Sequence, residues 1–452
     1  MNLTKSRETE PKTQREPLSW DEKLLIFAFP TLLCIAAIGQ FALGRGAEPA
    51  QIQFPAPVAL PVPNGFDVYL AAEAAIKLDV PAVDLIDDSP KLTPTDPKLA
   101  AQKYSLAKKD AWLKANAAGF ALFKQAQTLP CRSPESALPL GSGGFRYASS
   151  RQLSQLGRYK IIEINAFTMR KNWNGAVTSA LDALQMGIDI ANGGSMSMKY
   201  YSAQIQTNAR ETLSGPVDPI SKLSAAQARA AAKRLEAIVA RRTGYAEILE
   251  NSRWATLREF DYTSQQPNWQ SQMLANSGRE LTWREKLGLF ADPRSQIIDD
   301  INHAFDHNIA DLKKPLNAPL PGFTFQNPLS QNFVWVQSNW LDEARELTTL
   351  NVLLLRLALR AFEAENGRLP QKLSELSPRI LAKIPTDAYA DGAPFHFLWK
   401  GQKPRLYSVG PDGKDDGGKP LKEKYVGNSR SGRYNTTLDF GARGDYVAGI
   451  NH

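Results

Sequence analysis

Residues 341–365, LDEARELTTLNVLLLRLALRAFEAE, set the architecture of the C-terminal part of the chain. Their apolar positions recur at helical spacing and cover one broad side of a helix. These positions are Leu347, Leu350, Val352, Leu353, Leu354, Leu357, Ala358, Ala361 and Phe362. Asn366 and Gly367 end the predicted helix, and Pro370 follows as a residue that cannot continue it. The segment therefore predicts a long amphipathic helix with a wide apolar face to bury.

Short β-like segments follow this helix. They are PFHFLW at 394–399, RLYSV at 405–409 and DYVAG at 445–449. A helix with one apolar face buries that face against a small antiparallel sheet in the α+β class of folds. We therefore expect an α+β unit here.

Three segments in this region resemble the globular domain of the major pseudopilins of type II secretion. They are LRLALRAFEAENGRLPQKLSEL at 355–376, IPTDAYADGAPFHF at 384–397 and LYSVGPDGKDDGG at 406–418. The resemblance extends from Arg345 to Gly418 and loosely to the end of the chain. It implies a long N-terminal helix packed on a small sheet, and a link to secretion or to pilus-like assembly.

The resemblance also implies a calcium ion that organises the last loop. Calcium takes six to eight oxygen ligands, which oxygen-rich loops supply. Carried over to this chain, the ligands are the Val409 carbonyl and the carboxylates of Asp412 and Asp445, with Asp416 as an additional ligand. The alternative is a plain acidic turn that binds no ion.

The chain departs from the pseudopilin pattern in two places. Residues 419–443 lengthen the calcium loop and make it basic. A prepilin peptidase site precedes neither Leu24 nor Leu341. The C-terminal unit is therefore interpreted as a pseudopilin-like head on another scaffold, unable to enter a pilus by the usual route.

The N-terminal region predicts a membrane anchor. Residues 24–44, LLIFAFPTLLCIAAIGQFALG, carry no charge over 21 positions, which is enough to span roughly 30 Å of hydrocarbon. Five Lys and Arg residues precede this segment and only Arg45 lies in the 20 residues after it, which places the N-terminus in the cytoplasm. A cleaved signal peptide ending at Ala42–Gly44 is the alternative. Both interpretations put the rest of the chain outside the cytoplasm, and the first anchors it in the inner membrane by a single span.

The exported part divides at its proline-rich segments, and alanine-rich helical periodicity predominates between them. We expect a capping box at Ser224 and Gln227 to begin a helix that continues to about Phe260, with Gly244 as its weak point. The expected organisation is a cytoplasmic tail, a transmembrane helix, a proline-rich linker, a helical domain and the pseudopilin-like domain, at residues 1–23, 24–44, 45–64, 65–335 and 336–452.

Residues 158–190 predict two helices joined at 172–175, similar to a single tetratricopeptide-type hairpin. An ordinary packed hairpin is the first interpretation, because no second copy at a 34-residue period accompanies it and an isolated repeat cannot bury its own face. A groove that binds a peptide is the alternative.

One pattern predicts metal chemistry outside the calcium loop. Asp299, His303, His307 and Asp311 follow one another at i, i+4 spacing, so they share one face of a helix. Two histidines at this spacing can hold a transition metal, although the glutamate of the zincin motif is missing and no third ligand is identifiable. An envelope metal-dependent hydrolase using His303 and His307 is thus the alternative function.

The amino-acid composition excludes several classes of protein. With 43% hydrophobic and 22% charged residues in 452, the chain is neither disordered throughout, nor collagen-like, nor a multi-spanning membrane protein. Cys34 lies in the apolar segment and leaves Cys131 without a partner, which excludes a disulfide-stapled fold. The sequence contains no Gly-x-Ser-x-Gly, and Cys131 has no identifiable histidine partner.

The net charge of +8 does not indicate nucleic acid for an exported domain. The expected partners are the lipid bilayer and envelope or secretion-system proteins, and no small-molecule substrate is identified. We therefore expect a membrane-anchored binding or scaffold protein of the bacterial envelope, and not an enzyme.

Overall fold

The structure is a computed structural model that describes residues 51–77, 106–137, 143–214, 217–277, 293–314, 322–334, 339–400, 403–421, 424–426, 435–437 and 443–448. The predicted tail and transmembrane segment at 1–44 lie outside these ranges. No helix within the described ranges is long and apolar enough to cross a bilayer.

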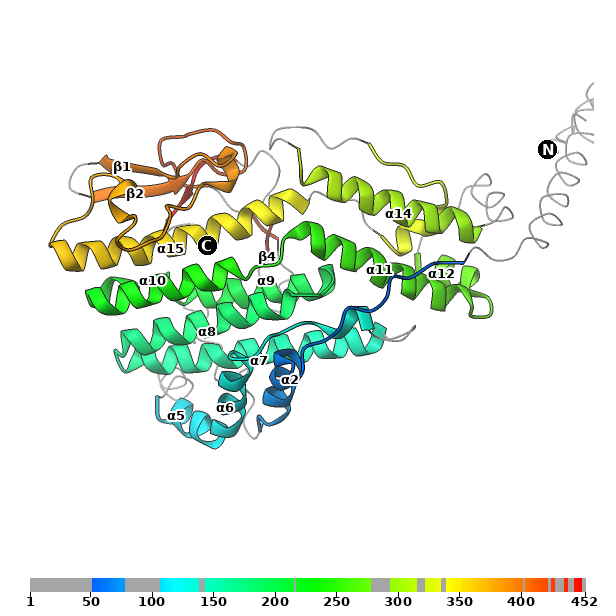
Figure 1. Ribbon diagram of the computed structural model, residues 1–452, viewed down its shortest axis with the longest axis horizontal. Helices are drawn as coiled ribbons and strands as arrows, with labels where there is room; N and C mark the ends of the chain where they lie inside the picture. The colour runs from blue at the N-terminus through cyan, green and yellow to red at the C-terminus, as the bar shows by residue number, and fades with distance from the viewer. Residues whose placement is uncertain are drawn as a thin grey trace, which may run out of the picture.

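The described part is mainly helical, with a small sheet near the C-terminus (Figure 1). The helices are α2 Gly65–Ala74, α5 Leu106–Ala115, α6 Ala117–Ala126, α7 Gly143–Met169, α8 Trp173–Ala191, α9 Met196–Glu211, α10 Ala225–Ala240, α11 Tyr245–Ser264, α12 Trp269–Ser277, α14 Pro293–Asp311 and α15 Asn339–Asn366. The strands are β1 His396–Lys400, β2 Lys403–Ser408, β3 Lys424–Val426, β4 Asn435–Thr437 and β5 Tyr446–Val447. Short 3-10 turns include η1 Pro134–Ala137, η2 Ile220–Lys222, η3 Pro328–Asn332, η4 Leu373–Leu376 and η5 Ala388–Ala390.

The predicted C-terminal helix and sheet are confirmed. α15 has 28 residues, which corresponds to about 42 Å. It ends where Gly367 adopts a φ of 65° and donates its N–H to the Glu363 carbonyl, because glycine reaches the left-handed region without steric cost. The three-stranded sheet has the order β1-β2-β5 and is antiparallel throughout. A separate two-stranded ribbon, β3-β4, lies within the insert at 419–443 and was not predicted.

The helices and the sheet are stacked in layers. Figure 1 shows β1 and β2 above α15, then α10 with α9, then α8 with α7, and finally α2, α5 and α6 on the opposite side. One hydrophobic cluster extends through the stack, from Phe66 in α2 through Leu181 in α8 and Leu357 in α15 to Tyr446 in β5. Residues on the two sides of the expected domain boundary at 335/336 therefore share one core.

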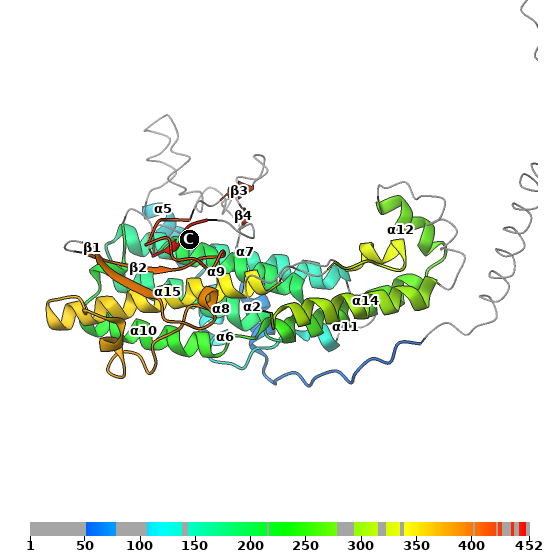
Figure 2. The ribbon, with the colours of Figure 1, turned by 90° about the horizontal axis from the view of Figure 1, so that it is seen from above.

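A second hydrophobic cluster holds one end of the elongated molecule together (Figures 1 and 2). It joins α11, α14 and η3 around the fully buried Phe260, with α12 packed beside them. The extended segment that enters the body at 51–64 lies along this end, since Ile52 and Phe54 pack against the cluster. The start of the described linker is therefore docked on the body, whereas residues 55–59 are exposed.

The helix expected from Ser224 to about Phe260 is two helices. The capping box is present, because the Ser224 N–H donates to Gln227 Oε1 at 3.0 Å and the Gln227 N–H donates to Ser224 Oγ at 3.3 Å. α10 ends at Ala240, and Gly244 adopts an extended backbone before α11 begins at Tyr245. The Tyr245 N–H donates to Glu343 Oε1 of α15 at 3.3 Å, so a side chain distant in sequence occupies this helix end.

The predicted hairpin at 158–190 is formed by α7 and α8. Asn172 caps α8 by accepting the Gly175 N–H at 3.0 Å. α8 is surrounded by α7, α9 and α10, and every residue from Ser179 to Ala191 is buried. The peptide-binding groove is thereby excluded for this helix, and the packed hairpin is confirmed.

Candidate functional site

The loop after β2 contains three of the four predicted calcium ligands. Val409 is buried and donates its N–H to Asp387 Oδ2 at 3.1 Å. Asp412 Oδ1 accepts the Lys414 N–H at 3.2 Å, which closes a local turn. Asp416 is exposed, and its backbone N–H donates to Asp445 Oδ1 at 3.1 Å. The loop thus meets Asp445 through its backbone.

Asp445, the fourth predicted ligand, is fully buried. Its Oδ2 accepts the N–H groups of Gly418 at 2.6 Å and Lys419 at 3.1 Å. Burial raises the pKa of Asp445 above its usual range, and the charges of Asp415 and Asp416 act in the same direction against the backbone donors. The chain therefore does bring this late acid back to the loop, as the resemblance implies.

These residues do not fit a cation site in the described structure. N–H donors surround the Asp445 carboxylate, whereas calcium requires several oxygen atoms converging on one point. Within the ranges the structure describes, no three His, Cys, Asp or Glu side chains are grouped to hold a metal ion. Calcium binding stays a prediction.

The histidine face lies on α14. His303 and Asp299 are exposed, whereas Asp311 is buried and lies 4.0 Å from Lys314 Nζ. His307 packs on the ring of Phe323, with 5.5 Å between ring centroids. Among the described residues these side chains form no group of three metal ligands. The hydrolase alternative likewise stays a prediction.

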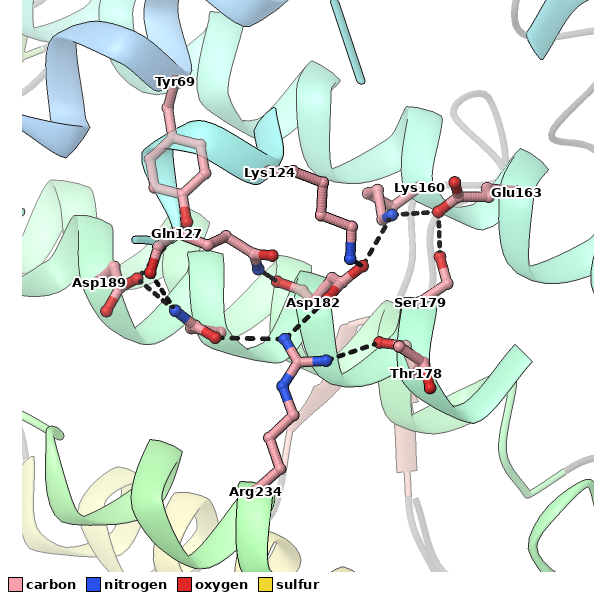
Figure 3. A network of polar contacts seen from close by, with 11 residues as sticks. Tyr69, Lys124, Gln127, Lys160, Glu163, Thr178, Ser179, Asp182, Asp189 and Arg234 are labelled. Carbon is pink, nitrogen blue, oxygen red and sulfur yellow. Dashed lines mark hydrogen bonds and ion pairs between the residues drawn. The ribbon is translucent and has the colours of Figure 1, made fainter. Parts of the chain in front are cut away.

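A buried polar network that was not predicted is centred on Asp182 of α8 (Figure 3). Asp182 Oδ1 accepts Arg234 of α10 at 2.7 Å, and Oδ2 accepts Lys160 of α7 at 3.2 Å and Lys124 of α6. Burial alone would raise the pKa of Asp182, but Lys160, Lys124 and Arg234 together hold it below its usual range. One carboxylate therefore joins four helices.

Lys160 is fully buried and is the second centre of this network. Besides Asp182 it pairs with Glu163, which also accepts the Ser179 hydroxyl (Figure 3). Its ammonium group lies 4.9 Å from the ring centroid of Phe123. The side chains of Lys160 and Asp182 are each only 1% exposed. Their charges therefore compensate each other and are not accessible to a ligand from solvent.

Asp189 extends the network along the same face of α8. Its Oδ1 lies 2.7 Å from Arg241 at the end of α10, and its Oδ2 accepts the Tyr69 hydroxyl of α2 at 3.4 Å. Burial raises the pKa of Asp189 to about 6, against the opposing effects of Arg241, Gln185 and Tyr69. Burial thus favours the protonated form of Asp189, and this residue links the first described helix to the core.

A separate buried ion pair joins α9 to α15. Lys199 Nζ contacts both oxygens of Glu346, which also accepts Gln206 Nε2 at 2.9 Å and lies 3.3 Å from Arg242. Burial opposes ionisation of Glu346, but Lys199 and Arg242 outweigh it and lower its pKa. The C-terminal helix is thereby held to the helical body by charge as well as by apolar packing.

A pattern in the sequence could have revealed the first network. Within the otherwise apolar segment 176–191, polar residues recur on one helical face at positions 179, 182, 185 and 189. A polar stripe in a helix that is apolar elsewhere requires buried partners. The partners themselves come from α2, α6, α7 and α10, and no local pattern identifies them.

The chain was compared with models of protein families, with curated proteins and with solved structures, and none of the three comparisons found a match.

Proposed function

We propose that this protein is a membrane-anchored extracytoplasmic scaffold of the bacterial envelope, linked to type II secretion or pilus-like assembly. The observation that carries the proposal is the position of the docked segment at 51–54. Ile52 and Phe54 pack at the α11–α14 end, and the guanidinium of Arg258 lies 5.5 Å from the Phe54 ring centroid. The β1-β2-β5 sheet lies at the other end of the molecule (Figures 1 and 2).

This position supports a defined orientation to the membrane. Six residues, 45–50, connect the predicted span to the described segment, and six extended residues reach at most about 20 Å. With the span in place, the α11–α14 end is held close to the bilayer and the C-terminal sheet is presented away from it. Such an arrangement suits a protein that holds a binding surface at a distance from the membrane.

The buried ion pairs support a rigid connection between the two ends. Lys199 and Arg242 of the helical body bind Glu346, and Arg229 binds Glu365 near the end of the same helix. Because α15 also shares the main hydrophobic core, the sheet cannot rotate freely on the helical body. The whole described part behaves as one body that carries the sheet.

The link to secretion rests on the C-terminal unit. A long helix packs against a three-stranded antiparallel sheet, and the loop containing Gly410–Gly418 returns to Asp445. This agrees with the arrangement that the resemblance to pseudopilins implies.

The test is photo-crosslinking of the full-length protein in its native membrane. A photoreactive amino acid replaces Trp399, which is 38% exposed on β1, and in a matched control replaces Tyr262, which is 41% exposed on α11. We expect secretion or pilus components to crosslink from position 399 and not from position 262. Adducts with cell-wall enzymes alone, or identical adducts from both positions, would contradict the assembly role.

The topology is tested separately. A cysteine introduced at the exposed Asp416 is treated with a membrane-impermeant maleimide on intact spheroplasts. We expect labelling without permeabilisation. A residue labelled only after lysis would contradict the extracytoplasmic location.

A further inference from the structure

The loop between β2 and β5 is built around an internal anion. Gly417 and Gly418 adopt φ values of 69° and 78°, in the left-handed region that glycine reaches without strain. Successive backbone N–H groups in such turns point into a concavity that binds anions. Here the N–H groups of Asp416, Gly418 and Lys419 all donate to the side chain of Asp445, at 3.1, 2.6 and 3.1 Å.

The backbone of Asp445 strengthens the same contact. Its N–H donates to the Lys419 carbonyl at 2.7 Å, and its carbonyl accepts the Leu421 N–H at 2.8 Å. Asp445 is thus joined to residues 416–421 by five hydrogen bonds, three of them to a carboxylate. Hydrogen bonds to a charged acceptor are the stronger kind.

Two other acids of the loop, Asp412 and Asp415, also accept hydrogen bonds. Asp412 accepts the Lys414 N–H at 3.2 Å. Asp415 Oδ1 accepts the Tyr407 hydroxyl at 3.0 Å and the Gly417 N–H at 2.8 Å. A loop closed by calcium turns its oxygens toward one point, because the ion needs six to eight of them. In this loop, backbone N–H donors converge on the Asp445 carboxylate instead.

We propose that the Asp445 carboxylate takes the place of a cation in this loop, so that backbone amides close the C-terminal sheet without calcium. The polarity of the site is inverted relative to the resembled family: the negative centre lies on Asp445, and residues 416–419 supply the positive ends of peptide dipoles. Strand β5 then stays paired with β2 through the anchoring of the residue before it. The inference concerns how the unit is closed and holds whether or not the assembly role is correct.

The experiment uses the full-length protein in detergent, with hydrogen exchange of the loop peptide at 414–421 and thermal unfolding as readouts. Both are measured in excess EGTA and in millimolar calcium chloride. We expect slow exchange of the loop amides and an unchanged unfolding temperature in both. For Asp445→Asn, which loses the charge but keeps the size, we expect exchange of this peptide to accelerate about tenfold or more.

Asp412→Ala is the matched control, because this side chain caps only a local turn. We expect it to leave the exchange of residues 416–419 nearly unchanged. Calcium that raises the unfolding temperature or slows loop exchange in the native protein, with the effect lost in Asp445→Asn or Asp412→Ala, would overturn the proposal. Calcium that slows exchange of the loop peptide in both variants would also overturn the proposal, because the Val409 carbonyl and the Asp416 carboxylate remain available to the ion. A calcium effect confined to peptides outside the loop, with slow loop exchange in EGTA, would support it.

Discussion

Lys199 Nζ lies 2.6 and 2.7 Å from the two carboxylate oxygens of Glu346, a pair that joins positions 147 residues apart. Lys199 belongs to α9, and Glu346 belongs to α15, the helix that supports the C-terminal sheet. Two buried charges are stable only as a pair, because either one alone would lose its hydration without compensation. This contact therefore makes the folding of the two parts interdependent.

The first prediction concerns this pair. We expect Glu346→Gln to lower the free energy of unfolding by about 3–5 kcal/mol, since it leaves the Lys199 ammonium buried without a carboxylate. Replacing both residues by methionine should restore most of this loss. Denaturant unfolding measures the effect, and Glu363→Gln, at an exposed pair on the same helix, is the control, with a loss below about 1 kcal/mol. Equal losses for the two single variants would contradict the prediction.

Acid should weaken the same junction. The lowered pKa of Glu346 stabilises the folded state above the ordinary value of 4.5, and this contribution is lost as the pH falls through the lowered pKa. We expect hydrogen exchange in α9 and in the first turns of α15 to accelerate together as the pH falls below 4.5. Independent responses of the two helices would show that the pair does not couple them.

Asp189 has the opposite dependence on pH. Because the pKa of Asp189 rises from 3.8 to about 6 on folding, the folded state favours the protonated acid. The free energy of unfolding therefore increases as the pH falls from 7 toward 4. Asp189→Asn should therefore raise the free energy of unfolding by about 1–3 kcal/mol at pH 7.5, by roughly half as much at pH 5 and by little at pH about 3.5. Asp306→Asn, which removes the exposed partner of the largely buried Arg253, is the control and should change the free energy of unfolding by at most about 1 kcal/mol. A similar loss at all of these pH values for Asp189→Asn would show that its hydrogen bonds outweigh the cost of its charge.

The Asp182 network should be sensitive to loss of its centre. We expect Asp182→Asn to cost about 3–5 kcal/mol, because the buried Lys160 loses one of its two carboxylates and Arg234 loses its ion-pair partner. Asp110→Asn removes a partly exposed pair with Arg170 and should cost at most about 1 kcal/mol. Thermal unfolding of the two variants side by side checks the contrast, and indistinguishable midpoints would argue against a structural role for the network.

The close contact of α7 with α9 provides a packing test. A Cβ added at Gly157 would lie 2.6 Å from Cγ1 of the buried Ile205. We expect Gly157→Ala to destabilise the protein by about 1–2 kcal/mol, because overpacking exceeds the gain in helix propensity. Gly244→Ala is the control, since the nearest atom, Glu343 Oε1, is 3.9 Å away. An increase in stability for Gly157→Ala would show that Ile205 moves without cost.

Local patterns were sufficient for several elements. The apolar stripe of residues 341–365 predicted α15, whose bounds are 339–366. The Ser224–Gln227 capping box and the hairpin at 158–190 were also confirmed, because each depends on residues within a few turns of one another. The break between α10 and α11 was predicted only as a weak point, since the acceptor for the Tyr245 N–H belongs to α15, about 100 residues later in the chain.

The candidate sites show even more clearly which features depend on local sequence and which depend on tertiary packing. The resemblance to pseudopilins implied that Asp445 returns to the loop, and Asp445 does reach residues 416–419. The sequence could not show that backbone N–H groups would donate to the Asp445 carboxylate. These hydrogen bonds depend on the turn made by Gly417 and Gly418. Helical periodicity depends on residues close in sequence, so it can be predicted from the sequence. Packing between distant segments determines the partners of the buried charges Lys160, Asp182, Lys199 and Glu346. A buried charge finds its counter-charge only when distant segments close around it, and the tertiary structure decides which segments those are.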